Sequence, residues 1–224
     1  MKPPCLHPLP LRVWHWTNAF IMIALIVTGL YLRLQGIAAL KPHDPVLSWH
    51  RYAGYAMIGA IAFWLIYTLA SKDTRSQYGI RKKDFPNVFP QIRFYLFSIF
   101  AGAENPFKAD PDHKYNPLQK MAYGALMFFF LPAQALTGLL FMDIPVVRPY
   151  LLSEGLIRPL DAIHVTLTYL LILYVIVHLY MATLGATFLS HTKAMITGYE
   201  DEDNRTHHEG PSGPVAASLE RTTE

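Results

Sequence analysis

Four long apolar segments, separated by polar stretches, dominate the hydrophobic pattern of the chain. They cover residues 13–32, 52–70, 121–142 and 162–189. Each reaches the length of roughly 17–25 residues that a transmembrane α-helix needs. The pattern therefore predicts an all-α integral membrane protein, a four-helix bundle that occupies residues 1–199.

Two further segments differ from these spans. Residues 92–101 form an apolar run that is too short to cross a bilayer, so we expect it to lie on the membrane surface or against a partner. Residues 200–224 are acidic and polar, which predicts a disordered tail.

The composition supports a membrane protein. The chain is 52% hydrophobic and only 16% charged, whereas soluble proteins carry more charge. The first apolar segment holds a histidine, two tryptophans and an asparagine near its start, and no small-residue cleavage site follows it. We therefore predict a retained helix here and not a signal peptide.

Basic residues near the predicted helix ends indicate the orientation in the membrane. Fourteen Lys and Arg residues lie in the two termini and in the loop between the second and third helices, and five lie on the opposite side. Because cytoplasmic loops carry the excess of Lys and Arg, we expect both termini in the cytoplasm. The net charge of +3 is thus a topology signal, and the chain has no basic stripe for nucleic acid.

A single cysteine, Cys5, limits the chemistry that the chain supports. It excludes an iron–sulfur cluster, a cysteine zinc site, a disulfide and the C-x-x-C-H attachment of c-type haem within this chain. No glycine-rich phosphate loop, G-x-S-x-G or H-E-x-x-H motif occurs. We therefore assign no catalytic residue and expect the chemistry to come from histidines and a bound cofactor.

Two of the ten histidines, His164 and His178, lie 14 residues apart in the last apolar segment. On an α-helix this spacing is four turns less about 40°, with a rise of roughly 21 Å. Both side chains therefore share one face, near opposite sides of a hydrocarbon core about 30 Å thick. Histidine inside a span is unfavourable unless it is paired or bound, which indicates two metal centres on a path across the membrane.

The topology pairs these histidines with two others by depth. His50 lies near the outer side with His164, and His15 lies near the cytoplasmic side with His178. Two imidazoles on one haem iron leave no open position, which suits electron transfer, whereas zinc would need four ligands. We therefore predict two haems b held by these four histidines. The alternative is that each histidine only packs between helices or lies at the interface.

Glycines and arginines in the same helices fit this geometry but have second interpretations. Gly29, Gly124 and Gly138 leave room either for a macrocycle or for close helix packing. Arg12 and Arg51 lie beside the two membrane surfaces, where they either pair with haem propionates or snorkel to the interface.

Several short motifs occur in an order that resembles a known family. The first helix contains R-V-W-H-W, the second opens with H-R-Y-A-G, K-Y-N-P-L-Q-K leads into the third, and the fourth contains H-x13-H-x-Y-M-A, followed by M-I-T-G-Y. Over residues 7–199 these motifs resemble the b-type cytochrome subunits of formate dehydrogenases, nickel–iron hydrogenases and related thiosulfate-reductase-like complexes.

The resemblance implies a four- or five-helix subunit of the bacterial cytoplasmic (inner) membrane that holds two haems b. An iron–sulfur subunit and a catalytic dehydrogenase or hydrogenase subunit would feed electrons to the outer haem. Menaquinone or ubiquinone would accept them near the inner haem, so this chain alone would not be a complete enzyme. Asn116 matches an asparagine that contacts the quinone in formate dehydrogenase subunits, with Gln119 close by; Asn116 could instead cap the third helix.

Two other functions are compatible with the sequence. A self-contained cytochrome b561-type quinone oxidoreductase uses a similar layout of histidines, although it needs neither the long cytoplasmic loop nor the tail. A histidine-lined metal transporter or a membrane scaffold belongs to a different class and would bind no haem.

Overall fold

The structure is a computed structural model in which the described residues form helices and connecting turns. It describes residues 7–35, 44–72, 82–103, 106–107, 115–141, 147–153, 155–185 and 187–199. Within these ranges no strand occurs, and four helices are long and apolar enough to cross a membrane. The predicted all-α architecture with four spans is therefore confirmed, whereas the predicted tail, residues 200–224, lies outside the described residues.

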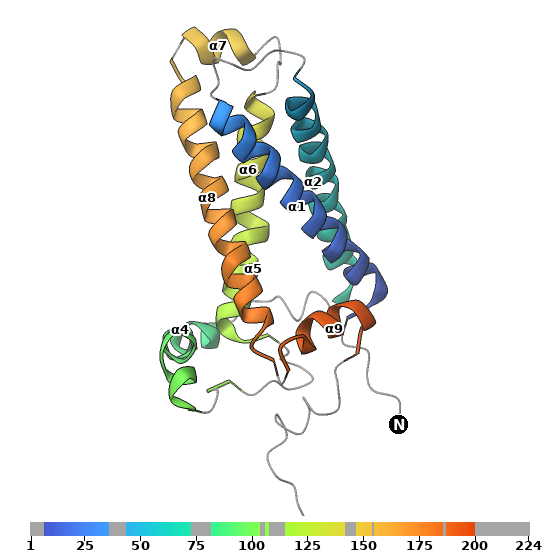
Figure 1. The fold of residues 1–224 in the computed structure, drawn as a ribbon, viewed down its shortest axis with the longest axis vertical. Coiled ribbons are helices and arrows are strands. Elements are labelled where there is room, and N and C mark those ends of the chain that lie inside the picture. Colours follow the sequence, from blue (N-terminus) through green and yellow to red (C-terminus); the bar gives the residue numbers. More distant parts are fainter. Residues whose placement is uncertain are drawn as a thin grey trace, which may run out of the picture. The chain divides into compact units, whose positions relative to one another are not determined.

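The four spans are longer at their starts than the apolar pattern predicts. They are α1 (Leu9–Gln35), α2 (Pro45–Ala70), the run from α5 (Pro117–Ala125) through the π-helical η4 (Leu126–Phe130) to α6 (Leu131–Phe141), and α8 (Ile157–Ala182) (Figure 1). In α2 the earlier start has a local cause. The carboxylate of Asp44 accepts hydrogen bonds from the backbone N–H groups of Val46 and Leu47, and Pro45 occupies the first helical turn. His50 consequently lies inside the helix and not at its end.

The fourth span ends earlier than predicted. The apolar pattern continues to residue 189, but α8 ends at Ala182 and the residues after it form turns and bends. Gly185 lies in this stretch, and glycine is a poor helix former. Hydrophobicity alone therefore placed the end of this helix seven residues too late.

The third span contains one π-helical turn. The backbone N–H of Leu131 donates to the carbonyl of Leu126, five residues earlier. Pro132 follows directly, and because proline has no N–H it cannot continue the ordinary i→i−4 pattern. A π turn carries an extra residue, so the face that α6 presents is rotated relative to the face of α5.

The chain divides into two compact units, Val13–Val175 and the pair of segments Met1–Arg12 and Ile176–Glu224. In the larger unit α1, α2, α6 and α8 contact one another in a ring. The Trp14 indole N–H donates to the carbonyl of Ala60, at 2.7 Å, and joins α1 to α2. Arg33 forms an ion pair with Asp161 at 3.1 Å and joins α1 to α8. Helix α6 contacts α2, and it is joined to α8 by hydrogen bonds of Gln134 and Thr137.

Trp64, in α2, is a buried aromatic residue of the same unit. Its ring lies 6.3 Å from that of Trp14, in α1, and 5.7 Å from that of Phe128, in η4. By contrast, Phe20 and Ile66 are exposed on the outer surface of the spans. An apolar outer surface is what a helix needs in contact with lipid tails.

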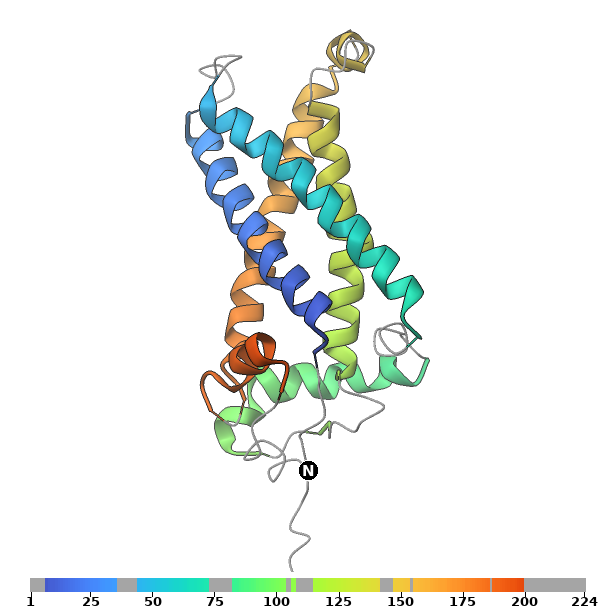
Figure 2. The same cartoon turned by 90° about the vertical axis from the view of Figure 1, so that its right-hand side faces the viewer.

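The segment between the second and third spans packs against the start of the third. It contains the 3-10 helices η2 (Lys82–Asn87) and η3 (Ser98–Ala101) and, between them, α4 (Val88–Leu96). Figure 2 shows α4 lying crosswise at the start of α5. Its inner face buries Gln91 and Phe94. Contact with the membrane surface, expected for residues 92–101, stays a prediction.

Two shorter helices complete the described fold. Helix α7 (Val147–Ser153) precedes α8, and α9 (Ser190–Thr197) belongs to the smaller unit. Helix α9 ends at Gly198, which has a positive φ of 90° and donates its N–H to the carbonyl of Ala194.

Candidate functional site

Two of the four predicted ligands lie next to each other in the larger unit. His50 comes from the second turn of α2 and His164 from α8, and both side chains are half-buried. Their ring centroids are 6.5 Å apart, with the ring planes inclined by 74°. The sequence predicted this outer pair from depth alone, and the structure brings it together.

The separation of the two rings matches that of two imidazoles on opposite sides of one metal ion. A metal–imidazole bond is about 2 Å long, and a ring centroid lies about 1 Å behind its own nitrogen. Two trans imidazoles therefore have centroids roughly 6 Å apart. In the described part of the chain no group of three or more His, Cys, Asp or Glu residues could hold a bare ion. A two-histidine site of this kind fits a haem, whose macrocycle supplies the other four ligands.

Each histidine of the pair contacts a threonine on a neighbouring helix. Oγ1 of Thr28, in α1, lies 2.8 Å from Nδ1 of His50. Oγ1 of Thr137, in α6, lies 2.8 Å from Nδ1 of His164. Neither threonine could be predicted as a site residue from the sequence, because the contact depends on packing between helices that are separate in the sequence.

A glycine follows each threonine and lies against the same imidazole. A Cβ atom at Gly29 would lie 3.2 Å from Cε1 of His50, and one at Gly138 would lie 3.4 Å from Cε1 of His164. These two positions therefore lack a side chain where the ring of a histidine comes close. Whether they also clear a macrocycle stays a prediction, as it does for Gly124, which lies in α5.

A glutamine completes the surroundings of His164. Nε2 of Gln134, in α6, lies 3.2 Å from Nε2 of His164 and donates to the hydroxyl of Thr168 at 2.9 Å. The edge of the Phe141 ring packs against the same imidazole, at 5.6 Å between centroids. His164 is thus held on several sides by α6, and the sequence analysis did not single out Gln134.

The two histidines of the predicted inner pair belong to different units: His15 to the larger one and His178 to the smaller one. His15 lies in α1 and packs edge-on against Trp16, with centroids 5.2 Å apart. His178 lies in the last turns of α8, which belong to the smaller unit. Their joint binding of a second haem stays a prediction.

The two predicted propionate partners differ in their surroundings. Arg12 donates to the carbonyl of Ile196 at the end of α9, where a cation is favourable because the last carbonyls of a helix carry partial negative charge. Arg51 follows His50 in α2 and is half-buried. A role toward propionates stays a prediction for both arginines.

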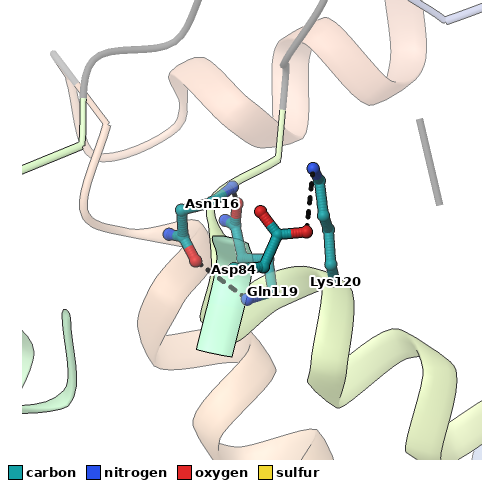
Figure 3. A network of polar contacts seen from close by, with 4 residues as sticks. All are labelled: Asp84, Asn116, Gln119 and Lys120. Atoms are coloured by element: carbon teal, nitrogen blue, oxygen red, sulfur yellow. Dashed lines mark hydrogen bonds and ion pairs between the residues drawn. The ribbon is translucent and has the colours of Figure 1, made fainter. Parts of the chain in front are cut away.

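Polar residues form a buried network at the start of the third span, between η2, α4 and α5 (Figure 3). Asn116 and Gln119 form a complete capping box. The N–H of Gln119 donates to Oδ1 of Asn116 at 2.8 Å, and the N–H of Asn116 donates to Oε1 of Gln119 at 3.0 Å. Asn116 is 2% exposed and also donates through Nδ2 to the hydroxyl of Tyr95. The cap that the sequence suggested for Asn116 is therefore present, and its role in quinone contact stays a prediction.

An ion pair lies beside this capping box. The Lys120 ammonium lies 3.7 Å from the carboxylate of Asp84, and the two side chains are 3% and 8% exposed. In the sequence, Lys120 counted only as one of the basic residues in the loop between the second and third helices. Residues 84 and 120 are too far apart in the sequence for their contact to be visible without the fold.

Comparisons with known proteins place the chain in a family. The profile of the prokaryotic cytochrome b561 family matches residues 6–198. The chain is also 34% identical, over 206 residues, to YdhU of Escherichia coli (strain K12), whose name proposes a cytochrome; the match covers 87% of this chain and 73% of YdhU. The b-type cytochrome expected from the motifs is confirmed, whereas membership of a particular complex stays a prediction. With its four apolar helices, this chain belongs to the prokaryotic cytochrome b561 family of multi-pass membrane proteins, which bind haem b and transfer electrons.

Proposed function

We propose that the chain is a di-haem cytochrome b that carries electrons across the bacterial inner membrane and reduces quinone near the cytoplasmic side. The outer haem would be held by His50 and His164, and the inner haem by His15 and His178. One observation carries this proposal: the outer imidazoles come from two different helices and lie side by side with a centroid separation of 6.5 Å, a distance at which both could hold one haem.

The residues of the chain serve this function by holding the ligands in place. A haem iron with two imidazole ligands has no open position and takes up and releases single electrons. Helices α1 and α6 contact the outer pair through threonine, glutamine, glycine and phenylalanine residues. This packing fixes the imidazoles and limits the access of water, both of which tune a redox centre.

The buried polar network at the start of α5 is our candidate for the quinone site. Asn116 and Gln119 supply amide groups there, and Asp84 and Lys120 supply charges next to them. Quinone carbonyl oxygens need hydrogen-bond donors, and quinone reduction needs protons. The amide groups would supply the hydrogen-bond donors. The protons would come from the cytoplasm, which the loop that contains Asp84 is predicted to face.

The electron donor defines two candidate forms of this function. In the first, an iron–sulfur subunit and a catalytic dehydrogenase or hydrogenase subunit deliver electrons to the outer haem, as the motif resemblance suggests. In the second, the chain is a stand-alone cytochrome b561-type quinone oxidoreductase, which the family match supports equally. Purification in mild detergent separates the two: co-eluting iron–sulfur and catalytic subunits support the first, and an isolated active cytochrome supports the second.

Replacement of single histidines tests the proposed ligands. His164→Ala and His50→Ala should each reduce the haem content of the purified chain from two haems b to one. His191→Ala, in α9 and outside the spans, is the matched control and should keep both haems. Unchanged haem content in the His164 and His50 variants would refute the assignment. A wild-type chain without haem would favour the metal transporter or scaffold.

A further inference from the structure

The dipeptide Thr-Gly occurs twice in the spans, and both copies contact the outer histidine pair. Thr28-Gly29 lies in α1 against His50, and Thr137-Gly138 lies in α6 against His164. In both copies the threonine hydroxyl lies 2.8 Å from Nδ1 and the glycine lies under Cε1 of the same ring. Two helices thus present one arrangement to two histidines.

The hydroxyl of Thr28 has a backbone acceptor besides His50. Its Oγ1 lies 2.6 Å from the carbonyl of Ala24 and 3.3 Å from that of Leu25. When the single hydroxyl proton goes to the carbonyl of Ala24, the oxygen is left to accept from Nδ1–H of His50. In this arrangement Nδ1 of His50 carries the ring proton, and Nε2 has a lone pair.

The same arrangement is available to Thr137. Its hydroxyl lies 3.0 Å from the carbonyl of Ala133 and 3.0 Å from that of Gln134, so its oxygen can accept from Nδ1–H of His164. Nε2 of Gln134 lies 3.2 Å from Nε2 of His164, so the Gln134 amide would have to move aside for that nitrogen to bind iron.

We propose that Thr28 and Thr137 are positioning residues that fix the outer histidines in the tautomer whose Nε2 binds iron. This proposal rests on the proposed function of the outer pair as haem ligands. A metal-bound histidine commonly donates its other N–H to a fixed acceptor, which orients the ring and makes the ligating nitrogen a stronger electron donor. The two hydroxyls therefore strengthen haem binding and, because a stronger donor favours ferric iron, lower the midpoint potential of the outer haem.

Isosteric substitutions in the full-length protein test this proposal. Thr28→Val and Thr137→Val remove the hydroxyl with little change in shape, whereas Thr28→Ser and Thr137→Ser keep it. Thr166→Val is the matched control, because Thr166 lies in the same helix as His164 and its side chain is exposed. The readouts are the rate of haem transfer to apomyoglobin and a spectroscopic redox titration, in which the inner haem is an internal reference.

Each valine variant should weaken haem binding by about 10- to 100-fold and raise the midpoint potential of one of the two haems. The serine variants and Thr166→Val should match the wild type in both measurements. Valine variants with wild-type haem retention and potentials would overturn the proposal, and so would serine variants as impaired as the valine ones. A haem-free wild type, or His50 and His164 variants that keep both haems, would refute the proposed function itself.

Discussion

An alanine at position 29 would place its Cβ 3.2 Å from Cε1 of His50. Carbon atoms in favourable contact lie about 3.5–4.0 Å apart, so the imidazole or helix α1 must move by a few tenths of an ångström. Overpacking of this kind typically destabilises a protein by about 1–3 kcal/mol, whereas replacing a helical glycine by alanine alone stabilises it by about 0.5–1 kcal/mol. We therefore expect Gly29→Ala to lose roughly 1 kcal/mol of stability and to disturb the outer haem.

The spans offer two comparison positions for this variant. A Cβ at Gly138 would lie 3.4 Å from Cε1 of His164, and one at Gly54, in α2, would have no neighbour within 4 Å. Gly138→Ala should therefore be nearly neutral, and Gly54→Ala should stabilise the protein by about 0.5–1 kcal/mol. Thermal unfolding in detergent, combined with the reduced haem spectrum, measures all three. If Gly29→Ala were as stable as Gly54→Ala and had an unchanged spectrum, the close approach of α1 to His50 would be wrong.

Three further predictions concern the inner haem and the buried polar network. His178→Met should abolish the inner haem and quinone reduction while one haem remains; unchanged haem content in a pyridine-haemochrome assay would rule His178 out as a ligand. Lys120→Met removes the ammonium beside the buried carboxylate of Asp84 and should cost about 3–5 kcal/mol of unfolding free energy. The double variant Asp84→Leu/Lys120→Met should recover most of this loss, and a neutral single variant would contradict the burial of the pair. Asn116→Ala removes the helix cap and should cost about 0.5–2 kcal/mol; a loss of quinone affinity without a loss of stability would instead favour a role in quinone contact alone.

The sequence predicted the spans and the outer pair because both depend on local or averaged properties. Hydrophobicity over some 20 residues identifies a span, and topology places His50 and His164 at the same depth. Helix ends were less predictable, because they depend on single groups. The cap at Asp44 lengthens α2, and turns after Ala182 shorten α8. The π turn at residues 126–130 leaves no signal in hydrophobicity at all.

The residues that hold the ligands could not be predicted from one sequence. Thr28 and Thr137 contact histidines that lie 22 and 27 residues away in the sequence, and these contacts depend on how each helix is rotated about its axis. The repeated Thr-Gly dipeptide was the available signal, but threonine and glycine are ordinary in membrane helices. The ion pair of Asp84 and Lys120 likewise appears only once η2 has packed against α5.

A reduced-minus-oxidised spectrum with pyridine-haemochrome quantitation on the purified wild-type chain tests the central claim most directly. We predict two low-spin haems b per polypeptide, one for each histidine pair. A single haem would show that one pair is misassigned, and the His164→Ala variant would then tell whether the remaining haem is the outer one. A chain that carries no haem would contradict the account.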